Sequence, residues 1–246
     1  MESTELVAVN ARPSAITIDL KRAAVIVVDM QNDFGTEGGM FHRAGFDISS
    51  IQAVIDPIAR LLDNARRLGV RVVYLKMAFE SDLSDIGREG SANRDRHLAW
   101  GVGQSVHCAD GTTSRVLIRD TWNTDIVDGL TPEPGDTVVY KNRFSGFVNP
   151  ELDAHLRSFA VTDLIFVGCT TSVCVESTLR DAMMLDYRCL LLEDCTHEPM
   201  GSNFSRTNHD ASVFIIANGF GWVTSSDELL RDLNQHFALT SDQPEH

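Results

Sequence analysis

The chain has 246 residues, of which 43% are hydrophobic and 23% charged, and its net charge at pH 7 is −14. This length suits one large α/β domain or two small ones, and such a chain can bury a sizeable core. The acidic charge excludes nucleic acid and anionic membranes as expected partners, and no apolar run reaches the roughly 18 residues that cross a bilayer.

In the first part of the chain, the predicted elements alternate between strand and helix. Ala23–Val28 is an apolar, β-branched run, typical of a buried parallel strand. Ile51–Leu68 carries apolar residues at helical spacing and is closed by Gly69. Val70–Leu75 predicts a second strand, whereas the polar segment from Glu80 to about Ser114 has no regular pattern.

The second part of the chain continues this alternation. It predicts strands over Thr137–Tyr140, Leu164–Val167 and Arg188–Leu192. It predicts helices over Pro150–Phe159, Val173–Leu185, Phe204–Asn218 and Asp227–Phe237. Asn149 is the expected N-cap of the first of these helices. Strands that alternate with helices imply right-handed βαβ units. We therefore expect one α/β domain over residues 1–246, three-layer α/β/α, with a mostly parallel, Rossmann-like sheet, an N-terminal extension over 1–18 and a flexible tail over 238–246.

The cysteines indicate a reducing environment. There are five, widely spread and without a C-x-x-C pair: Cys108, Cys169, Cys174, Cys189 and Cys195. The odd number and the spread argue against a disulfide framework, and the missing C-x-x-C pair argues against a structural zinc site. The first ten residues lack a basic stretch followed by an apolar one, so we expect no secretory signal and a cytoplasmic location.

Polar side chains follow three of the predicted strands. Asp29 comes directly after a buried strand, where partial desolvation raises a carboxyl pKa and suits a general base. Lys141 follows another strand, where its ammonium group can hold a thiolate or polarise a carboxylate. Cys174 lies near a helix N-terminus, which lowers a thiol pKa. Taken singly, each has a structural alternative: a turn cap, a surface charge or a buried thiol.

Taken together, these residues have the composition of a covalent catalytic site. The carboxyl ends of parallel strands meet at one edge of a sheet, and ligands bind there. A carboxylate, an ammonium group and a thiol at that edge supply a base, an orienting group and a nucleophile. The sequence therefore predicts covalent catalysis by Asp29, Lys141 and Cys174.

The same residues carry a resemblance to a known family. Asp29–Phe34, Lys141 and Thr171–Arg180 occur in the order of the catalytic landmarks of the isochorismatase-like cysteine hydrolases, which the chain resembles from about Ala11 to Phe237. Within this family it is most similar to ureidoacrylate amidohydrolases of pyrimidine breakdown. The resemblance implies a cofactor-independent amidohydrolase that cleaves a small carbamoyl or ureido amide through a thioester or thiocarbamate intermediate. It also implies a homo-oligomer, a dimer or a tetramer.

The resemblance assigns roles to individual site residues. It implies Cys174 as the nucleophile, Asp29 as the general base and Lys141 as the group that pairs with both. It also implies a cis peptide bond between Cys169 and Thr170. The backbone N–H groups of Thr170 and Cys174 would then form the oxyanion hole.

Five further residues are candidates for substrate contacts. The rings of Phe34 and Phe144 could sandwich a planar substrate, or could be ordinary core aromatics. Asn93 and Trp122 are suggested by approximate correspondence with the amidohydrolases. Arg143 could meet a substrate carboxylate, or could form a surface or subunit salt bridge.

The chain also departs from one branch of the family. Nicotinamidases carry an Asp-x-His pair and a further histidine as metal ligands after the second strand. This chain has Lys76–Glu80 there, and His97 and His107 lie further along without such a motif. We therefore expect no catalytic metal.

Several other functions remain open. A biuret or N-carbamoylsarcosine-type amidase would use the same three residues. An isochorismatase-type vinyl ether hydrolase is disfavoured because those enzymes usually lack the nucleophilic cysteine, and this chain has Cys174. A non-catalytic scaffold is disfavoured because all three catalytic residue types are kept.

Overall fold

The computed structural model describes residues 5–108 and 111–241. Its centre is a six-stranded sheet in which every neighbouring pair of strands is parallel. From one edge to the other, the strands are β10 (Trp222–Thr224), β9 (Arg188–His197), β8 (Asp163–Cys169), β3 (Ala23–Val28), β4 (Arg71–Met77) and β7 (Thr137–Lys141). The strands predicted from the sequence are all in this sheet.

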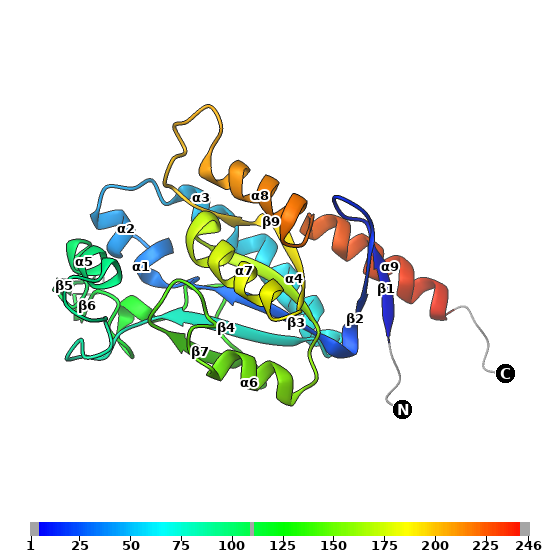
Figure 1. The fold of residues 1–246 in the computed structure, drawn as a ribbon, viewed down its shortest axis with the longest axis horizontal. Helices are drawn as coiled ribbons and strands as arrows, with labels where there is room; N and C mark the ends of the chain where they lie inside the picture. Colours follow the sequence, from blue (N-terminus) through cyan, green and yellow to red (C-terminus); the bar gives the residue numbers. More distant parts are fainter. Residues whose placement is uncertain (1–4, 109–110, 242–246) are drawn as a thin grey trace.

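Helices cover both faces of the sheet (Figure 1). Successive side chains of a strand point to opposite faces, so Val25 and Val27 of β3 belong to one core and Ile26 belongs to the other. The first core is closed by α4 (Ile55–Arg67) and α9 (Ser226–Ser241), and the second by α6 (Glu151–Ser158), α7 (Glu176–Met184) and α8 (Asn208–Gly219). The predicted three-layer α/β/α fold is confirmed.

The predicted N-terminal extension packs against this domain over its described part. β1 (Leu6–Val9) and β2 (Ile16–Asp19) form an antiparallel hairpin whose inward side chains join the core beneath α4 and α9. Between them, the backbone of Arg12 exchanges hydrogen bonds of 2.8 and 3.0 Å with that of Val223 in β10. At the other terminus, α9 continues through residues 238–241, where we expected a tail, and 242–246 lie outside the described residues.

Several predicted elements have different boundaries in the structure. The helix expected over 51–68 is two helices, α3 (Ser49–Ala53) and α4, because Pro57 has no N–H to donate to the carbonyl of Ala53. Pro150, not Asn149, occupies the N-cap position of α6, and no side chain caps that helix. The helix expected from Val173 begins with a π-helical turn, η3 (Thr171–Val175).

The chain between β4 and β7 forms a long excursion at one end of the molecule (Figure 1). Within the stretch that showed no regular pattern, it contains α5 (Ala92–Ala99) and the small antiparallel pair β5 (Ser105–His107) and β6 (Thr113–Arg115), and it then continues through η2 (Trp122–Thr124). The connection after β3 holds α1 (Asn32–Gly35) and α2 (Met40–Arg43). Both segments lie beyond the carboxyl ends of the strands, where parallel sheets bind ligands.

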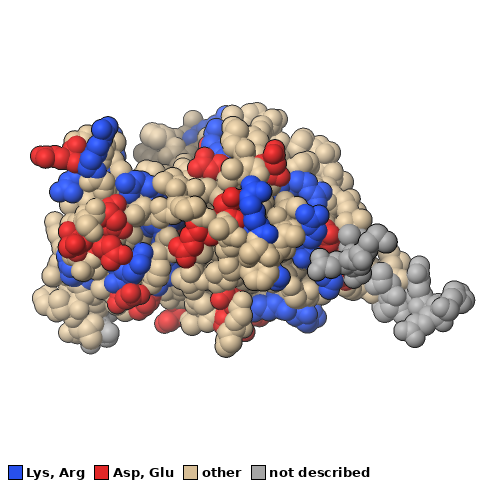
Figure 2. Space-filling view, turned by 60° about the horizontal axis from the view of Figure 1, so that its bottom comes forward, with Lys and Arg blue, Asp and Glu red and all other residues tan. Residues whose placement is uncertain are grey.

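Two further features of the molecule concern the distribution of its surface charges and the length and hydropathy of its helices. Figure 2 shows Lys and Arg side chains interspersed with Asp and Glu on one face of the molecule, so the charges there do not gather into a patch of one sign. In the part of the chain that the structure describes, no helix is long and apolar enough to cross a membrane.

Candidate active site

Two of the predicted catalytic side chains form a buried ion pair. Asp29 directly follows β3, with a φ of 50°, and Lys141 is the last residue of β7. The Nζ of Lys141 donates a hydrogen bond of 2.7 Å to Oδ2 of Asp29, and each side chain is 1% exposed. Two opposite charges are thus held together away from water at the edge of the sheet that the sequence predicts.

The third residue, Cys174, lies on η3, which connects β8 to α7. Because β8 is the direct neighbour of β3, this turn places the thiol beside the ion pair. The thiol is buried, and both Asp29 and Lys141 are close enough to shift its pKa. The structure therefore brings together the carboxylate, the ammonium group and the thiol.

Burial affects the protonation of all three side chains, Asp29, Cys174 and Lys141. It raises the pKa of the Asp29 carboxyl, although the charge of Lys141 acts in the opposite direction. Burial and then the charge of Asp29 raise the pKa of the Cys174 thiol. The pKa of Lys141 is raised because Asp29 and Cys174 together outweigh the effect of burial. The resting site is therefore a neutral thiol beside an ion pair.

The expectation that the helix N-terminus lowers the pKa of Cys174 is thus wrong. Loss of water around the thiol raises its pKa, and the neighbouring carboxylate opposes a second negative charge. Such a thiol attacks a carbonyl only if a base removes its proton at the same time. Asp29, whose pKa is raised, is within reach for that step.

Asp29 is held in place by the backbone of β4. Its Oδ1 accepts a hydrogen bond of 3.0 Å from the N–H of Met77, and its own N–H donates to the carbonyl of Leu75 at 2.9 Å. Gln31 binds the same residue of β4: its Oε1 accepts from Met77 N–H at 2.7 Å, and its Nε2 donates to Met77 O at 3.0 Å. One carboxylate oxygen is therefore fixed by the strand, and the other faces Lys141.

The turn before Cys174 has the expected cis peptide bond between Cys169 and Thr170. Gly168 precedes it with a φ of 110°, and a Cβ at this position would lie 2.1 Å from the carbonyl oxygen of Val28. Only glycine permits this close approach of β8 to β3. The Sγ of Cys169 donates to the carbonyl of Asp29 at 3.1 Å, so this thiol joins the two strand ends.

A small pocket opens onto Cys174 and Thr170. It contains about 330 Å³ not filled by protein atoms, including the part that is open to solvent. Its wall is mostly apolar and aromatic and consists of Phe34, Met40, Phe41, Met77, His97, Trp100, Leu117, Phe144, Thr170, Val173, Cys174 and Met200. A pocket with this apolar and aromatic lining suits a small, largely planar molecule.

Comparison with known proteins shows to which family the chain belongs. A family model described as an isochorismatase domain matches residues 23–228. The chain belongs to the isochorismatase family. This confirms the family that the sequence resemblance indicates.

Individual relatives match nearly the whole chain. The ureidoacrylate amidohydrolase RutB of Rhizobium rhizogenes is 39% identical over 95% of this chain and 92% of its own length. The ureidoacrylate amidohydrolase RutB of Agrobacterium fabrum is 40% identical over 94% of this chain and 98% of its own length. Among solved structures, a cysteine hydrolase from Pseudomonas syringae pv. phaseolicola superimposes with a TM-score of 0.74 at 30% identity, covering 96% of this chain and 100% of its own.

The predicted substrate contacts divide into two groups. Phe34 and Phe144 line the pocket, as expected. Asn93 and Arg143 line a neighbouring cleft instead, because their side chains donate to backbone carbonyls of the excursion: Asn93 to Ile86 at 2.7 Å, and Arg143 to Asp85 at 3.1 Å.

Trp122 also lies outside the pocket wall. Its carbonyl accepts a hydrogen bond of 2.8 Å from Asn32, which joins η2 to α1. In the structure it therefore connects two segments beyond the strand ends.

Sequence reasoning missed one carboxylate that shapes the pocket. Asp33 is buried, and it accepts hydrogen bonds from the N–H of Met40 at 2.9 Å and of Leu117 at 2.7 Å, as well as from the amide of Asn123. Burial raises its pKa to about 6. Asp33 thereby joins two segments of the pocket wall that are far apart in sequence. Its only signal was its place in the motif that begins at Asp29.

A second missed carboxylate supports the turn that carries Cys174. Glu198 is buried, and its Oε2 accepts hydrogen bonds from the N–H and the hydroxyl of Ser172 at 3.2 and 2.7 Å. Its Oε1 has no partner among the described residues, and burial raises its pKa. Glu198 follows β9, which extends five residues further than its apolar run predicted.

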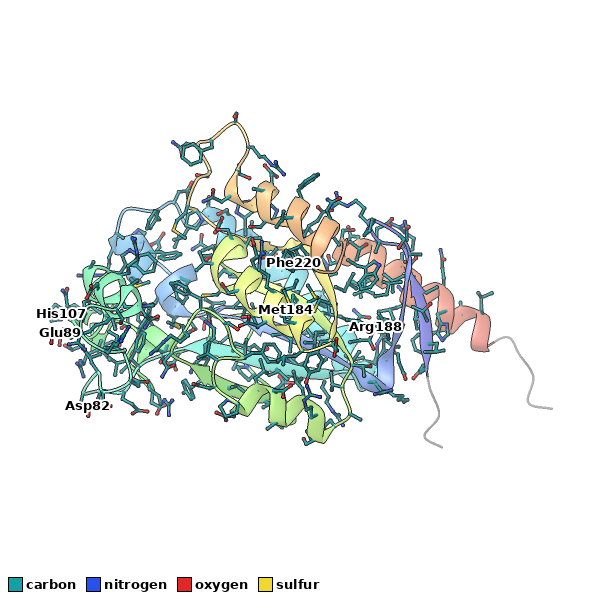
Figure 3. The ribbon with its side chains drawn as sticks, in the orientation of Figure 1. Asp82, Glu89, His107, Met184, Arg188 and Phe220 are labelled. Atoms are coloured by element: carbon teal, nitrogen blue, oxygen red, sulfur yellow. The ribbon has the colours of Figure 1, made fainter. Side chains whose placement is uncertain are left out.

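The two histidines considered as metal ligands lie in different surroundings. His97 is buried in the pocket wall, whereas His107 is exposed on β5 at the outer end of the molecule (Figure 3). Among the described residues, no three His, Cys, Asp or Glu side chains are grouped so that they could hold a metal ion. That catalysis needs no metal stays a prediction.

Proposed function

We propose that this chain is a cysteine-dependent amidohydrolase that cleaves a small ureido compound of the ureidoacrylate type. The observation that carries the proposal is the buried Asp29–Lys141 ion pair at 2.7 Å, with the Cys174 thiol beside it and a small pocket in front. The names of the most similar relatives support the substrate class. A cytoplasmic location and a homo-oligomer stay predictions from the sequence.

In the first step, the thiol of Cys174 attacks the carbonyl carbon of the ureido group. Asp29 accepts the thiol proton as the S–C bond forms, and the carbonyl electrons move to oxygen. The N–H groups of Thr170 and Cys174 donate to this oxyanion in the proposed mechanism. Lys141 neutralises the charge of Asp29 before the proton moves, and it stabilises the thiolate while the bond forms.

In the second step, the carbon–nitrogen bond breaks. Asp29 returns its proton to the leaving nitrogen, and the carbamoyl group stays on Cys174 as a thiocarbamate. Asp29 then takes a proton from water, the resulting hydroxide attacks the carbonyl, and the C–S bond breaks. The products are the amine and carbamate, which decomposes to ammonia and carbon dioxide, and the free thiol is regenerated when Asp29 gives back its proton.

The pocket supports a small planar substrate. Phe34 and Phe144 are both in its wall, together with thioether and aliphatic side chains that exclude water. Such surroundings strengthen electrostatic interactions at the reacting carbonyl. They also favour a conjugated ureido compound over a bulky or highly charged amide.

The test is ammonia release, coupled to glutamate dehydrogenase, on a panel of ureidoacrylate or its saturated analogue N-carbamoyl-β-alanine, biuret, N-carbamoylsarcosine and nicotinamide. We expect turnover of the ureido acids, lost in Cys174→Ala and kept in Cys189→Ala, a matched change at another buried thiol. Wild-type rates in Cys174→Ala would contradict the mechanism. Turnover of biuret or N-carbamoylsarcosine alone would keep the mechanism and refute the substrate.

A further inference from the structure

One polar group in the pocket wall has no role in the proposed reaction. Thr170 and Cys174 belong to the nucleophile turn, and most of the other lining side chains are aliphatic, aromatic or thioether groups. His97, on α5, is 1% exposed and lines the same pocket. Of the described lining residues, it alone has a side-chain nitrogen that can accept a hydrogen bond.

The hydrogen bond on one side of the ring fixes the tautomer of His97. Its Nδ1 is 2.6 Å from the carbonyl oxygen of Asn93, one helical turn earlier. A carbonyl oxygen only accepts, so Nδ1 carries the hydrogen. Burial lowers the pKa of His97, and this outweighs the effect of the Asn93 carbonyl, so the ring is neutral at pH 7 and Nε2 has a free lone pair.

The surroundings of the ring leave this lone pair without a partner. Rings of three neighbours pack around His97, with centroids at 5.0 Å for Phe79, 6.0 Å for Trp100 and 5.5 Å for Phe144. Among the described residues, His97 makes its side-chain hydrogen bond through Nδ1 and none through Nε2. An acceptor on the wall of an apolar pocket gains a hydrogen bond from a ligand that brings an N–H, so this position favours such a ligand.

The proposed substrate has such donors. When its carbonyl oxygen faces the backbone N–H groups of Thr170 and Cys174, its ureido N–H groups must find acceptors elsewhere in the pocket. Asp29 is already occupied by Met77 N–H and Lys141. Because the pocket is otherwise apolar, an N–H that met only its walls would lose its hydrogen bonds to water without replacement.

We propose that Nε2 of His97 accepts a hydrogen bond from an N–H of the substrate's ureido group and thereby selects ureido compounds over analogues of the same shape that lack that N–H. This makes His97 a specificity-determining residue, and the inference rests on the proposed function. A site built around a hydrogen bond rejects the analogue that lacks it, because its buried acceptor is then left unpaired.

The experiment compares three substrates of nearly equal shape. N-carbamoyl-β-alanine has both kinds of ureido N–H, 3-(carbamoyloxy)propanoate has oxygen in place of the internal N–H, and N-acetyl-β-alanine has methyl in place of the terminal NH₂. The ratio of kcat/KM values between the first compound and each analogue is measured for the wild type and for His97→Phe, which keeps a planar ring without the acceptor. Intrinsic differences in reactivity cancel when these ratios are compared between variants.

We expect His97→Phe to reduce at least one of the two ratios by about 10- to 100-fold, through a lower kcat/KM for the ureido compound. His97→Gln places an amide oxygen near the position of Nε2 and should restore part of the discrimination. His107→Phe, the same change at an exposed histidine, should leave both ratios unchanged. Equal ratios in the wild type and His97→Phe for both analogues would overturn the proposal.

A binding measurement separates this inference from the proposed function. Calorimetry with Cys174→Ala, with and without His97→Phe, records the affinities for the same three compounds without turnover. If the wild type hydrolyses none of them but binding still depends on the N–H and on His97, the proposed reaction fails and the role of His97 stands. Affinities that are too weak to measure, or that are unaffected by His97→Phe, would refute that role.

Discussion

Replacing Lys141 by methionine removes one partner of the buried ion pair and leaves the carboxyl of Asp29 without its counter-charge. Methionine has a similar length and leaves little empty space, so the main effect is electrostatic. Removing one partner of a buried pair typically costs about 3–5 kcal/mol. The Asp29 carboxyl avoids part of this cost by taking up a proton, which makes the cost dependent on pH.

The sign of this dependence follows from the direction of the pKa shift. Burial raises the pKa of Asp29 in the folded protein, and without Lys141 nothing comparable lowers it. The folded state then holds a proton that the unfolded state loses above its ordinary pKa of about 3.9, so stability falls as pH rises, by about 1.4 kcal/mol per unit. Lys141→Met should therefore be less stable than the wild type by about 3–5 kcal/mol at pH 7, and by less at pH 5, where protonation of Asp29 removes part of the penalty.

Urea denaturation at several pH values between 5 and 7 measures the free energy of unfolding. The matched control is Asp29→Asn combined with Lys141→Met, which removes both charges and should recover most of the lost stability with no such slope. If Lys141→Met were as stable as the wild type at pH 7, or if the double variant were no more stable than the single one, our account of the ion pair would be refuted.

Four further predictions concern the site. Glu198→Ala should lower kcat about tenfold, because the turn at Ser172 loses its hydrogen-bond acceptor. Glu198→Gln keeps an oxygen there and should remain near the wild-type rate. Steady-state kinetics measure both variants, and equal kcat values for the two would exclude a positioning role of Glu198. Gly168→Ala should destabilise the fold by more than about 3 kcal/mol in urea denaturation, since its Cβ meets the carbonyl of Val28. Iodoacetamide should label Cys174 slowly at pH 7 and faster at higher pH, as followed by mass spectrometry, because the pKa of the thiol is raised; rapid labelling at pH 7 would show a thiolate instead. EDTA should leave the reaction rate unchanged, and a loss restored by added metal would contradict this.

The grouping of Asp29, Lys141 and Cys174 was predictable because the topology places these residues at one edge of the sheet. Apolar strands in alternation with helices imply a parallel sheet, and its carboxyl edge gathers whatever polar residues follow the strands. Asp29, Lys141 and Cys174 stand at such positions, so their proximity follows from the fold. Pro57 also marks a helix boundary in the sequence, since it lacks the N–H that a continuous helix needs.

The pocket wall was less predictable, because it depends on contacts between segments that are distant in sequence. α5 buries an imidazole among aromatic rings instead of an aliphatic stripe, so its polar sequence carries little periodic signal. The carboxyl of Asp33 joins Met40 and Leu117, a pairing that no local pattern reveals. The pKa of Cys174 depends on how completely the folded chain excludes water, which only the structure provides.

The excursion between β4 and β7 has a consequence for how this scaffold can change. It supplies His97, Trp100 and Leu117 to the pocket, whereas Asp29, Lys141 and Cys174 lie outside it, on or just after the sheet strands. The carboxyl of Asp33 is one of the contacts that anchor the excursion to the rest of the site. Exchange of this single stretch, with its anchoring contacts kept, would alter which molecules the pocket admits without moving these three side chains. New substrates are therefore accessible to descendants of this chain through insertions and deletions in one connection, without any change to the sheet.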